Sequence, residues 1–221
     1  MDDALTWLLD TVQSIDPVAR TLIAGIAILL ETSVLVGLLV PGDTVVLVAS
    51  TGITSLTEFF ALAIAVIIGA LAGESVGFAI GRHFGPRIRS SRAGRWIGQA
   101  QWEKAETYVA RRGGFAVFVS RFLPVLHSLV PVTVGMGGMT YSRFVAWTLP
   151  ACTIWSFGYA GVGWMAAGSY RELSSQLSGA SYLFVAIVVV FAAVVYLTKK
   201  RIARSEARYM ESAGPGGGVQ D

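Results

Sequence analysis

Hydrophobic positions divide the chain into long apolar blocks separated by short polar segments. The first pattern, Asp3–Ser14, is amphipathic, with Trp7 and several leucines on one side, and predicts a helix lying at a membrane interface. The apolar blocks that follow cover residues 21–53, 56–84, 114–139, 141–168 and 180–198. Blocks of this length predict helices embedded in a membrane.

The first apolar block, residues 21–53, is too long and too interrupted to be one crossing. Its 33 residues would form a helix about 50 Å long, against roughly 30 Å of hydrocarbon. Pro41 and Gly42 interrupt the block, and the acids Glu31 and Asp43 lie within it. A helical hairpin that enters and leaves on one side of the membrane fits this pattern better.

The block at 114–139 is also interrupted, by Pro124 and Pro131, and it carries Arg121 and His127. A continuous transmembrane helix rarely contains two prolines and an arginine. The pattern therefore favours a second hairpin.

Charge distribution supports the same topology. Basic residues concentrate at 85–112 and in the tail from Lys199, and the positive-inside rule places both regions in the cytoplasm. Because the blocks at 141–168 and 180–198 already supply two crossings, the block at 114–139 must return to its starting side.

The predicted fold is an all-α polytopic membrane protein of the inverted-repeat transporter type. Two oppositely oriented re-entrant hairpins pack among about three full transmembrane helices. The N-terminal interfacial helix occupies residues 1–19 and the membrane domain residues 20–198. A cytoplasmic basic loop is expected at 85–112, and a disordered cytoplasmic tail that starts with basic residues at 199–221.

Glycine recurs at every fourth position through the block at 56–84 and just beyond it, at residues 69, 73, 77, 81 and 85. Each glycine inside a helix costs about 1 kcal/mol relative to alanine. Five on one face therefore predict that another element packs unusually close. Glu74 lies between Gly73 and Gly77, facing protein rather than lipid.

Composition agrees with this class and excludes several functions. Of 221 residues, 54% are hydrophobic and 14% charged, whereas soluble proteins have about 25% charged residues. One cysteine, Cys152, excludes an internal disulfide, and two histidines are too few for a histidine-rich metal site. No HExxH or protease-like aspartate pair is present, so no enzyme activity, metal, cofactor or nucleic-acid partner is expected.

The two hairpin blocks share a short pattern. With an offset of 90 residues, Leu39–Pro41 falls on Leu129–Pro131, and Glu31 falls on Arg121. So short a match could be a coincidence in an apolar chain, and the sequence leaves both explanations open. In a true repeat, broken helices from opposite faces would meet at mid-depth, as in many transporters.

Four ionisable residues lie inside apolar blocks: Glu31, Asp43, Glu74 and Arg121. Each costs roughly 2.5–3.5 kcal/mol at the centre of a membrane helix, so they must pair or line a wet cavity. Glu31 is the foremost candidate partner of Arg121 because of the repeat. They are either structural ion pairs that fix one hairpin against the other or a binding site.

A phosphate is the most economical ligand for such a site. Helix N-termini at the chain breaks offer free N–H groups, and the planar guanidinium of Arg121 suits a phosphate. The three acids would then take up and release protons. His127 could be a second phosphate contact with pH-dependent charge, or a neutral histidine hydrogen-bonded within the hairpin.

The tryptophans are not expected to take part in the predicted site. Trp96 and Trp102 suggest that the basic loop contacts anionic lipid headgroups, although an ordinary cytoplasmic loop fits better. The remaining tryptophans of the apolar blocks are expected to be core or interface aromatics rather than a stacking site: Trp147, Trp155 and Trp164.

Three motifs together resemble the DedA family of the SNARE-associated Golgi, or VTT-domain, superfamily. They are PGD at 41–43, GALAGESVGFAIGRHFG at 69–85 and SRFLPVLHSLVPVTVGMGGM at 120–139. The resemblance covers about residues 20 to 200. It implies a bacterial inner-membrane protein with two opposed re-entrant hairpins. It also implies movement of polyprenyl phosphate or phospholipid between leaflets, dependent on the proton-motive force.

The resemblance also implies site residues. The paired membrane acids of the family match Glu31 and Asp43, and its first functional arginine matches Arg121. Its second arginine falls at His127, which puts constant charge there in doubt. The glycine-rich acidic motif contributes Glu74, with Phe78 where family members often have tyrosine.

The sequence therefore predicts a multi-pass lipid transporter, of flippase or scramblase type, in the bacterial plasma membrane. Its expected partners are protons and lipids with phosphate headgroups, with undecaprenyl-type phosphate first and phospholipid second. Two alternatives stay open: a proton-coupled ion or drug antiporter, and a membrane-biogenesis factor that transports nothing. Whether the protein forms a homodimer is also open.

Overall fold

A computed structural model describes residues 2–33, 42–92, 95, 98–123, 126–174, 186–187, 189–197, 200–201 and 204. Within these residues the regular structure is entirely helical. The first half contains α1 (Asp2–Ser14), α2 (Pro17–Thr32), α3 (Gly42–Thr51) and α4 (Leu56–Ser90). The second half contains α6 (Gln99–Arg112), α7 (Gly114–Ser120), α8 (Leu126–Met136) and α9 (Tyr141–Ser174).

Each interrupted block consists of two short helices on either side of a break. The first block forms α2 and α3, and the second forms α7 and α8. At about 1.5 Å per residue, helices of this length cross only part of the hydrocarbon layer. Pro41 and Pro124 lie outside the described residues, while Gly42 begins α3. Pro131 lies inside α8 and not at the break, which falls before Leu126.

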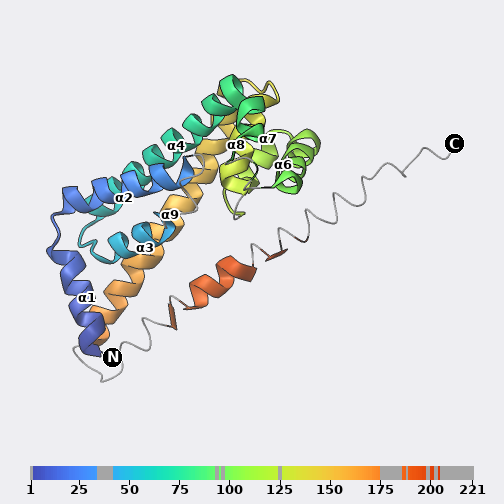
Figure 1. Ribbon diagram of the computed structural model, residues 1–221. Helices are drawn as coiled ribbons and strands as arrows, with labels where there is room; N and C mark the ends of the chain where they lie inside the picture. Colours follow the sequence, from blue (N-terminus) through green and yellow to red (C-terminus); the bar gives the residue numbers. More distant parts are fainter. Residues whose placement is uncertain are drawn as a thin grey trace.

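The packing of the helices repeats between the two halves. Helix α2 packs against α4 and α3 against α9, while α7 packs against α9 and α8 against α4. Helix α1 contacts α3 as α6 contacts α8, and the long helices α4 and α9 contact each other. The pairs α2–α3 and α7–α8 approach from opposite ends of the α4–α9 pair (Figure 1). These equivalent contacts support the repeat that the short sequence match suggested.

The glycine stripe of α4 is where both hairpins pack. A methyl group on Gly69 would overlap the carbonyl oxygen of Gly25, and one on Gly73 would overlap the hydroxyl of Thr32, both in α2. Further along α4, a methyl group at position 81 would overlap the backbone of α8, and one at position 85 its Met136 side chain. The predicted close packing is confirmed: α2 lies on the first half of the stripe and α8 on the second.

The region expected to be a loop is partly helical. Helix α4 continues to Ser90, and α6 occupies half of residues 85–112. Trp102 of α6 packs against α8 and is 1% exposed. Trp102 is therefore a core residue and does not face lipid headgroups; Trp96 lies outside the described residues.

Membrane crossing is supported most directly for α4. Its stretch Leu56–Gly85 is long and apolar enough to span a membrane, with a mean hydropathy of 2.2. Helices α1 and α2 pass the same test only together, and they meet at an angle of 99°. The crossings by α9 and by residues 180–198, and the re-entrant path of the hairpins, stay predictions.

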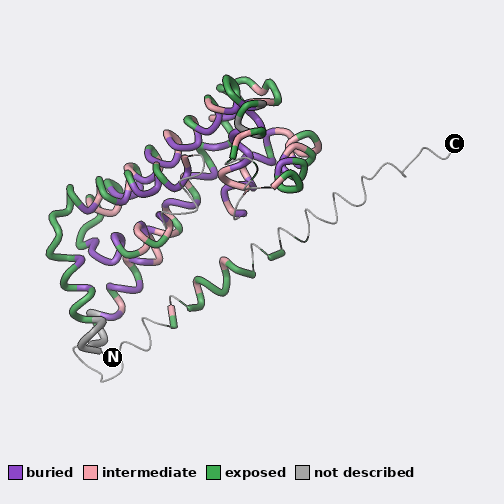
Figure 2. Tube along the Cα trace, viewed as in Figure 1, coloured by how far each residue is buried: buried purple, intermediate pink, exposed green. Residues whose placement is uncertain are grey.

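Buried residues lie where the helices meet in the middle of the bundle, and exposed residues lie on the outer faces (Figure 2). The exposed apolar residues include Leu22, Ile26, Ile64, Ile68, Ile154 and Met165. A surface of this kind is typical of a protein that contacts lipid.

Candidate functional site

Arg121 and Glu74 form an ion pair in the interior of the bundle. Arg121 follows the last residue of α7, and its Nη1 donates to Oε1 of Glu74 at 3.3 Å. Both side chains are 3% exposed. Glu74 therefore is the direct partner of Arg121, and the expectation that placed Glu31 first is corrected. The glycine stripe explains why: it brings α4 close to both hairpins, so an acid beside it reaches the second hairpin's break.

Helix α9 contributes two further contacts to this ion pair. The guanidinium carbon of Arg121 lies 4.5 Å from the centroid of the Trp155 ring, within cation–π range. The Cys152 thiol donates to Oε1 of Glu74 at 3.8 Å. Trp155 is the core aromatic that the sequence predicted, and it also packs against the arginine, a contact that the sequence did not predict.

Two donors of the Arg121 guanidinium have no hydrogen-bond partner among the described residues. These are Nε and Nη2, and both atoms are buried. A buried polar group without a partner costs about 1–3 kcal/mol, and more when it is charged. Native structures contain few such groups, and each needs an explanation, such as a functional role or a bound water or ion.

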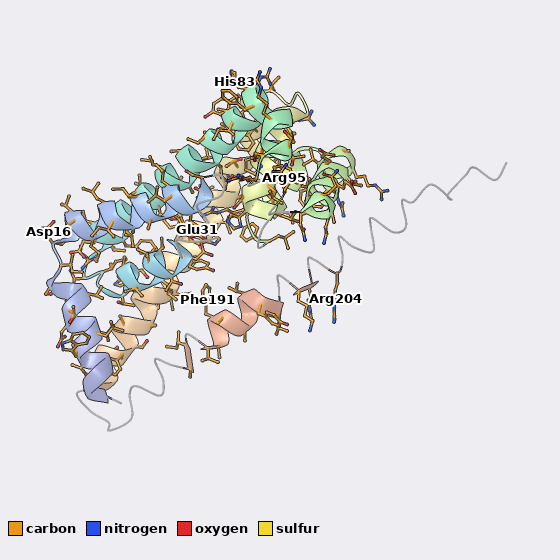
Figure 3. All side chains as sticks on the ribbon, in the orientation of Figure 1. Asp16, Glu31, His83, Arg95, Phe191 and Arg204 are labelled. Carbon is orange, nitrogen blue, oxygen red and sulfur yellow. The ribbon has the colours of Figure 1, made fainter. Side chains whose placement is uncertain are left out.

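The break of the first hairpin contributes two further acids. Oε2 of Glu31, in the last turn of α2, accepts a hydrogen bond from the backbone N–H of Asp43 at 2.7 Å. Glu31 therefore binds the N-terminus of α3, where the helix dipole favours an anion. Gly42 is required here, because a methyl group would overlap the Glu31 carboxylate. Figure 3 places Glu31 near the centre of the bundle.

Arg121 brings both hairpins into one electrostatic group. Its guanidinium interacts with the carboxylates of Asp43 and Glu31 in addition to Glu74. The three acids predicted to be membrane-embedded thus all act electrostatically on the one predicted arginine, and Glu74 contacts it directly. When all four residues are ionised, this group has an excess of negative charge.

His127 lies in the first turn of α8 and is half-buried. Its Nδ1 is 3.4 Å from the carbonyl oxygen of Leu123, one turn earlier in the chain. This contact agrees with a histidine hydrogen-bonded within its own hairpin. Its role as a phosphate contact stays a prediction.

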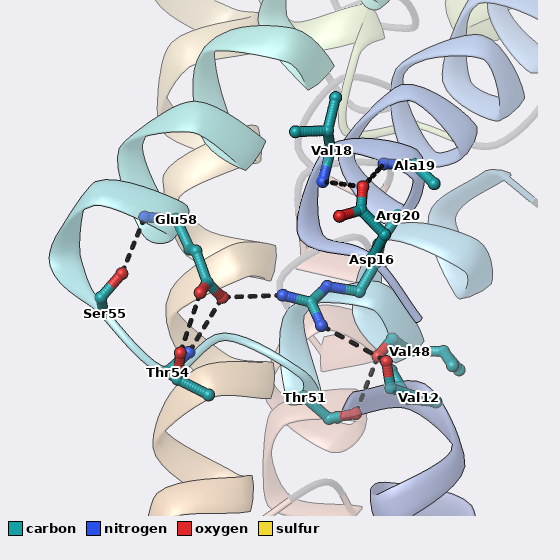
Figure 4. Close-up of polar contacts among 10 residues, drawn as sticks. All are labelled: Val12, Asp16, Val18, Ala19, Arg20, Val48, Thr51, Thr54, Ser55 and Glu58. Carbon is teal, nitrogen blue, oxygen red and sulfur yellow. Dashed lines mark hydrogen bonds and ion pairs between the residues drawn. The ribbon is translucent and has the colours of Figure 1, made fainter. Parts of the chain in front are cut away.

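The sequence did not predict a second buried arginine, Arg20. Its Nη2 donates to Oε2 of Glu58 at 2.7 Å and its Nη1 to the carbonyl oxygen of Val12 at 3.3 Å (Figure 4). Both charged residues lie at the ends of apolar blocks, where sequence reasoning expects exposed flanking charges. The neighbouring N-cap Asp16 and the following Pro17 are local signals for the start of this helix.

Metal binding has no support in the described part of the chain, which contains no group of three or more His, Cys, Asp or Glu suited to an ion.

The sequence profile of the VTT domain matches residues 40–165, more than half of the chain. The protein belongs to the DedA family of VTT-domain proteins. Protein DedA of Escherichia coli (strain K12) is 26% identical to it over 174 residues, covering 72% of this chain and 80% of that protein. Family membership identifies a bacterial membrane protein.

Two other relatives extend the comparison. Undecaprenyl phosphate transporter A of Staphylococcus aureus (strain NCTC 8325 / PS 47) is 30% identical over 115 residues, half of this chain and 57% of its own. An uncharacterized membrane protein of Mycobacterium tuberculosis (strain ATCC 25618 / H37Rv) is 28% identical over 211 residues, 91% of this chain and 95% of its own. No solved structure matches the chain.

Proposed function

We propose that this DedA-family protein moves a lipid with a phosphate headgroup between membrane leaflets. The observation that carries the proposal is the buried guanidinium of Arg121, whose Nε and Nη2 have no partner among the described residues. A phosphate accepts hydrogen bonds from such a planar pair of donors with matching geometry. The similarity to a protein named undecaprenyl phosphate transporter A makes polyprenyl phosphate the first candidate and phospholipid the second.

The charge of the site gives protons a role. Three acids face Arg121, and a phosphate would add further negative charge. Binding is therefore favoured when at least one of Glu31, Asp43 and Glu74 takes up a proton, and release is favoured when it leaves. Coupling to the proton-motive force follows from this exchange.

The hairpins supply the movement in this proposal. Glu31 and Asp43 belong to the first hairpin and Arg121 to the second, so protonation changes the attraction between them. The two hairpins then rock about the site between α4 and α9. His127, in the first turn of α8, is proposed as the second phosphate contact.

A sided assay in proteoliposomes tests the proposal. Labelled polyprenyl phosphate and labelled phospholipid are followed at two pH values with the native chain, Arg121→Ala and Arg121→Lys. We expect Arg121→Ala to slow headgroup translocation roughly 100-fold, because a buried charge-pair partner contributes about 2–5 kcal/mol. Arg121→Lys should restore only part of the rate, since it keeps the charge and loses the planar donors.

The matched control is Arg87→Ala, which removes an exposed arginine at the far end of α4 and should leave the rate unchanged. Unaltered translocation by Arg121→Ala at equal folded amounts would refute the proposal. Ion flux in liposomes that contain no phosphate lipid to translocate would instead favour an antiporter. Full complementation by a variant lacking Glu31, Asp43 and Arg121 would favour a structural role.

A further inference from the structure

An apolar crevice runs between α9 and the helical residues 189–197. Its first part has a volume of about 160 Å³ and is lined by Phe122, Trp155, Tyr159 and Phe191, among others. Its second part has a volume of about 480 Å³ and continues past Val162. The two parts share Phe191 and Val194 in their walls, so they lie next to each other along the same interface.

The crevice begins at the charged site. The Trp155 ring, which faces the Arg121 guanidinium at 4.5 Å, also lines the crevice. Trp155 stacks on Tyr159 with ring centroids 4.1 Å apart, and Tyr159 meets the edge of Phe191 at 5.3 Å. Figure 3 labels Phe191 on the segment that faces α9. A row of three aromatic rings therefore leads from the arginine into apolar space.

The crevice is also accessible from the side of the bundle. Ile154 is 58% exposed and Val194 54% exposed, and both line it. A hydrocarbon chain in the surrounding lipid can enter sideways without passing any charged residue among its lining residues. The headgroup end of such a chain would then arrive at Arg121.

We propose that this crevice holds the hydrocarbon tail of the lipid whose phosphate binds Arg121, with Trp155 as the boundary between headgroup and tail. This inference rests on the proposed function and adds a second subsite to it. Because lipid tails are as apolar as these side chains, the crevice contributes little hydrophobic affinity over the bilayer. The crevice instead determines where the tail lies, so the test must measure the position of the tail on the protein.

The probe is a polyprenyl phosphate with a photoreactive diazirine in its tail, added to the full chain in liposomes. After illumination, mass spectrometry maps the adducts. We expect adducts on Ile154, Tyr159 and Val194 to exceed those on Ile64 and Ile68 of α4 about tenfold. The last two residues face lipid elsewhere on the bundle, being 51% and 60% exposed.

Glycines of α9 provide a matched pair of variants. Gly158 lines the crevice, and a Cβ there would meet no atom within 4 Å, so Gly158→Leu fills the space without a backbone clash. Gly168 has equally open surroundings but lines neither part of the crevice. Gly158→Leu should lower crevice labelling about tenfold, because the leucine occupies the space of the tail, whereas Gly168→Leu should not.

The outcomes separate this inference from the proposed function. Equal labelling of the crevice and of α4, or labelling that Gly158→Leu does not change, overturns the tail site. If Arg121→Ala still blocks translocation in that case, the proposed function stands alone. If Arg121→Ala leaves translocation intact while the crevice is still labelled, two claims fail together. They are the link between the crevice and Arg121, and the proposed function.

Discussion

Two buried arginines in this protein have opposite surroundings. Arg20 is 4% exposed and Arg121 is 6% exposed, so both are removed from solvent. Arg20 makes a short 2.7 Å bond to Glu58, which also accepts hydrogen bonds from the backbone N–H and hydroxyl of Thr54. Arg121 makes one longer bond of 3.3 Å and leaves two donors without a partner among the described residues.

Their locations explain the difference. Arg20 lies in the first turn of α2 and bonds to α1 and to the start of α4. The carboxylate of Glu58 neutralises its charge. Arg121 contacts Glu74 of α4 and is also under the electrostatic influence of Glu31 and Asp43 from the first hairpin. A satisfied pair holds elements in one arrangement, whereas an unsatisfied group can exchange partners. We therefore expect Arg20 to contribute to stability and Arg121 to contribute to transport.

The largest effects should come from neutralising each pair completely. Arg121→Gln with Glu74→Gln should reduce translocation roughly 100-fold. The melting temperature of this double variant in detergent should stay unchanged or rise, because buried ion pairs are often replaced by neutral groups without loss of stability.

Arg20→Gln with Glu58→Gln should lower the free energy of unfolding by about 1–3 kcal/mol, through the loss of charge-assisted bonds.

Translocation by the Arg20–Glu58 double variant, measured per folded molecule, should equal that of the native chain. Loss of transport in this variant at equal folded amounts would contradict the comparison. So would a large drop in melting temperature when the Arg121–Glu74 pair is neutralised.

A smaller effect should follow from Glu74→Gln alone. The amide oxygen can still accept from Nη1 of Arg121, but one negative charge leaves a site that holds three acids. Binding of polyprenyl phosphate near neutral pH should tighten about tenfold, since less repulsion opposes the phosphate. The measurement is equilibrium binding of the labelled lipid, with Glu58→Gln as the control outside the site. Weaker binding by Glu74→Gln would show that the carboxylate assists the phosphate.

Much of the fold was readable from the sequence because its signals are local. The long interrupted blocks predicted α2–α3 and α7–α8, and the glycines at four-residue spacing predicted the packing face of α4. The four ionisable residues inside apolar blocks were also found, since a membrane makes each of them costly. The same cost predicted that they pair or line a wet cavity, and Arg121 and Glu74 form an ion pair.

Partner choice was not readable, because it depends on how the helices cross. The repeat favoured Glu31 for Arg121, but Glu31 instead binds the N-terminus of α3, and the close α4–α8 packing presents Glu74. Trp155 looked like any aromatic of an apolar helix until α9 was placed against α7. Arg20 and Glu58 lie at block ends, where a charge needs no partner and gives no signal.

Replacing Arg20 by lysine tests whether positive charge alone is enough at this position, and its effect should be smaller. Arg20→Lys keeps the positive charge but cannot reach Glu58 and the Val12 carbonyl oxygen at the same time with a planar fork. The free energy of unfolding should fall by about 1 kcal/mol, the contribution of one hydrogen bond. Thermal unfolding in detergent measures it, and headgroup translocation should not change. A loss as large as that of the double variant Arg20→Gln with Glu58→Gln would mean that the ammonium forms no useful pair with Glu58.

The smallest effect should be at Thr54, whose hydroxyl donates to Oε1 of Glu58 at 2.8 Å from an exposed position. Thr54→Ala should cost about 0.5 kcal/mol, because water replaces the lost donor and the backbone N–H of residue 54 still binds Glu58. Thr54→Ser, which keeps the hydroxyl, should unfold at the native temperature. If instead Thr54→Ala slowed translocation, the Arg20–Glu58 pair would contribute to transport, and the contrast between the two arginines would be wrong.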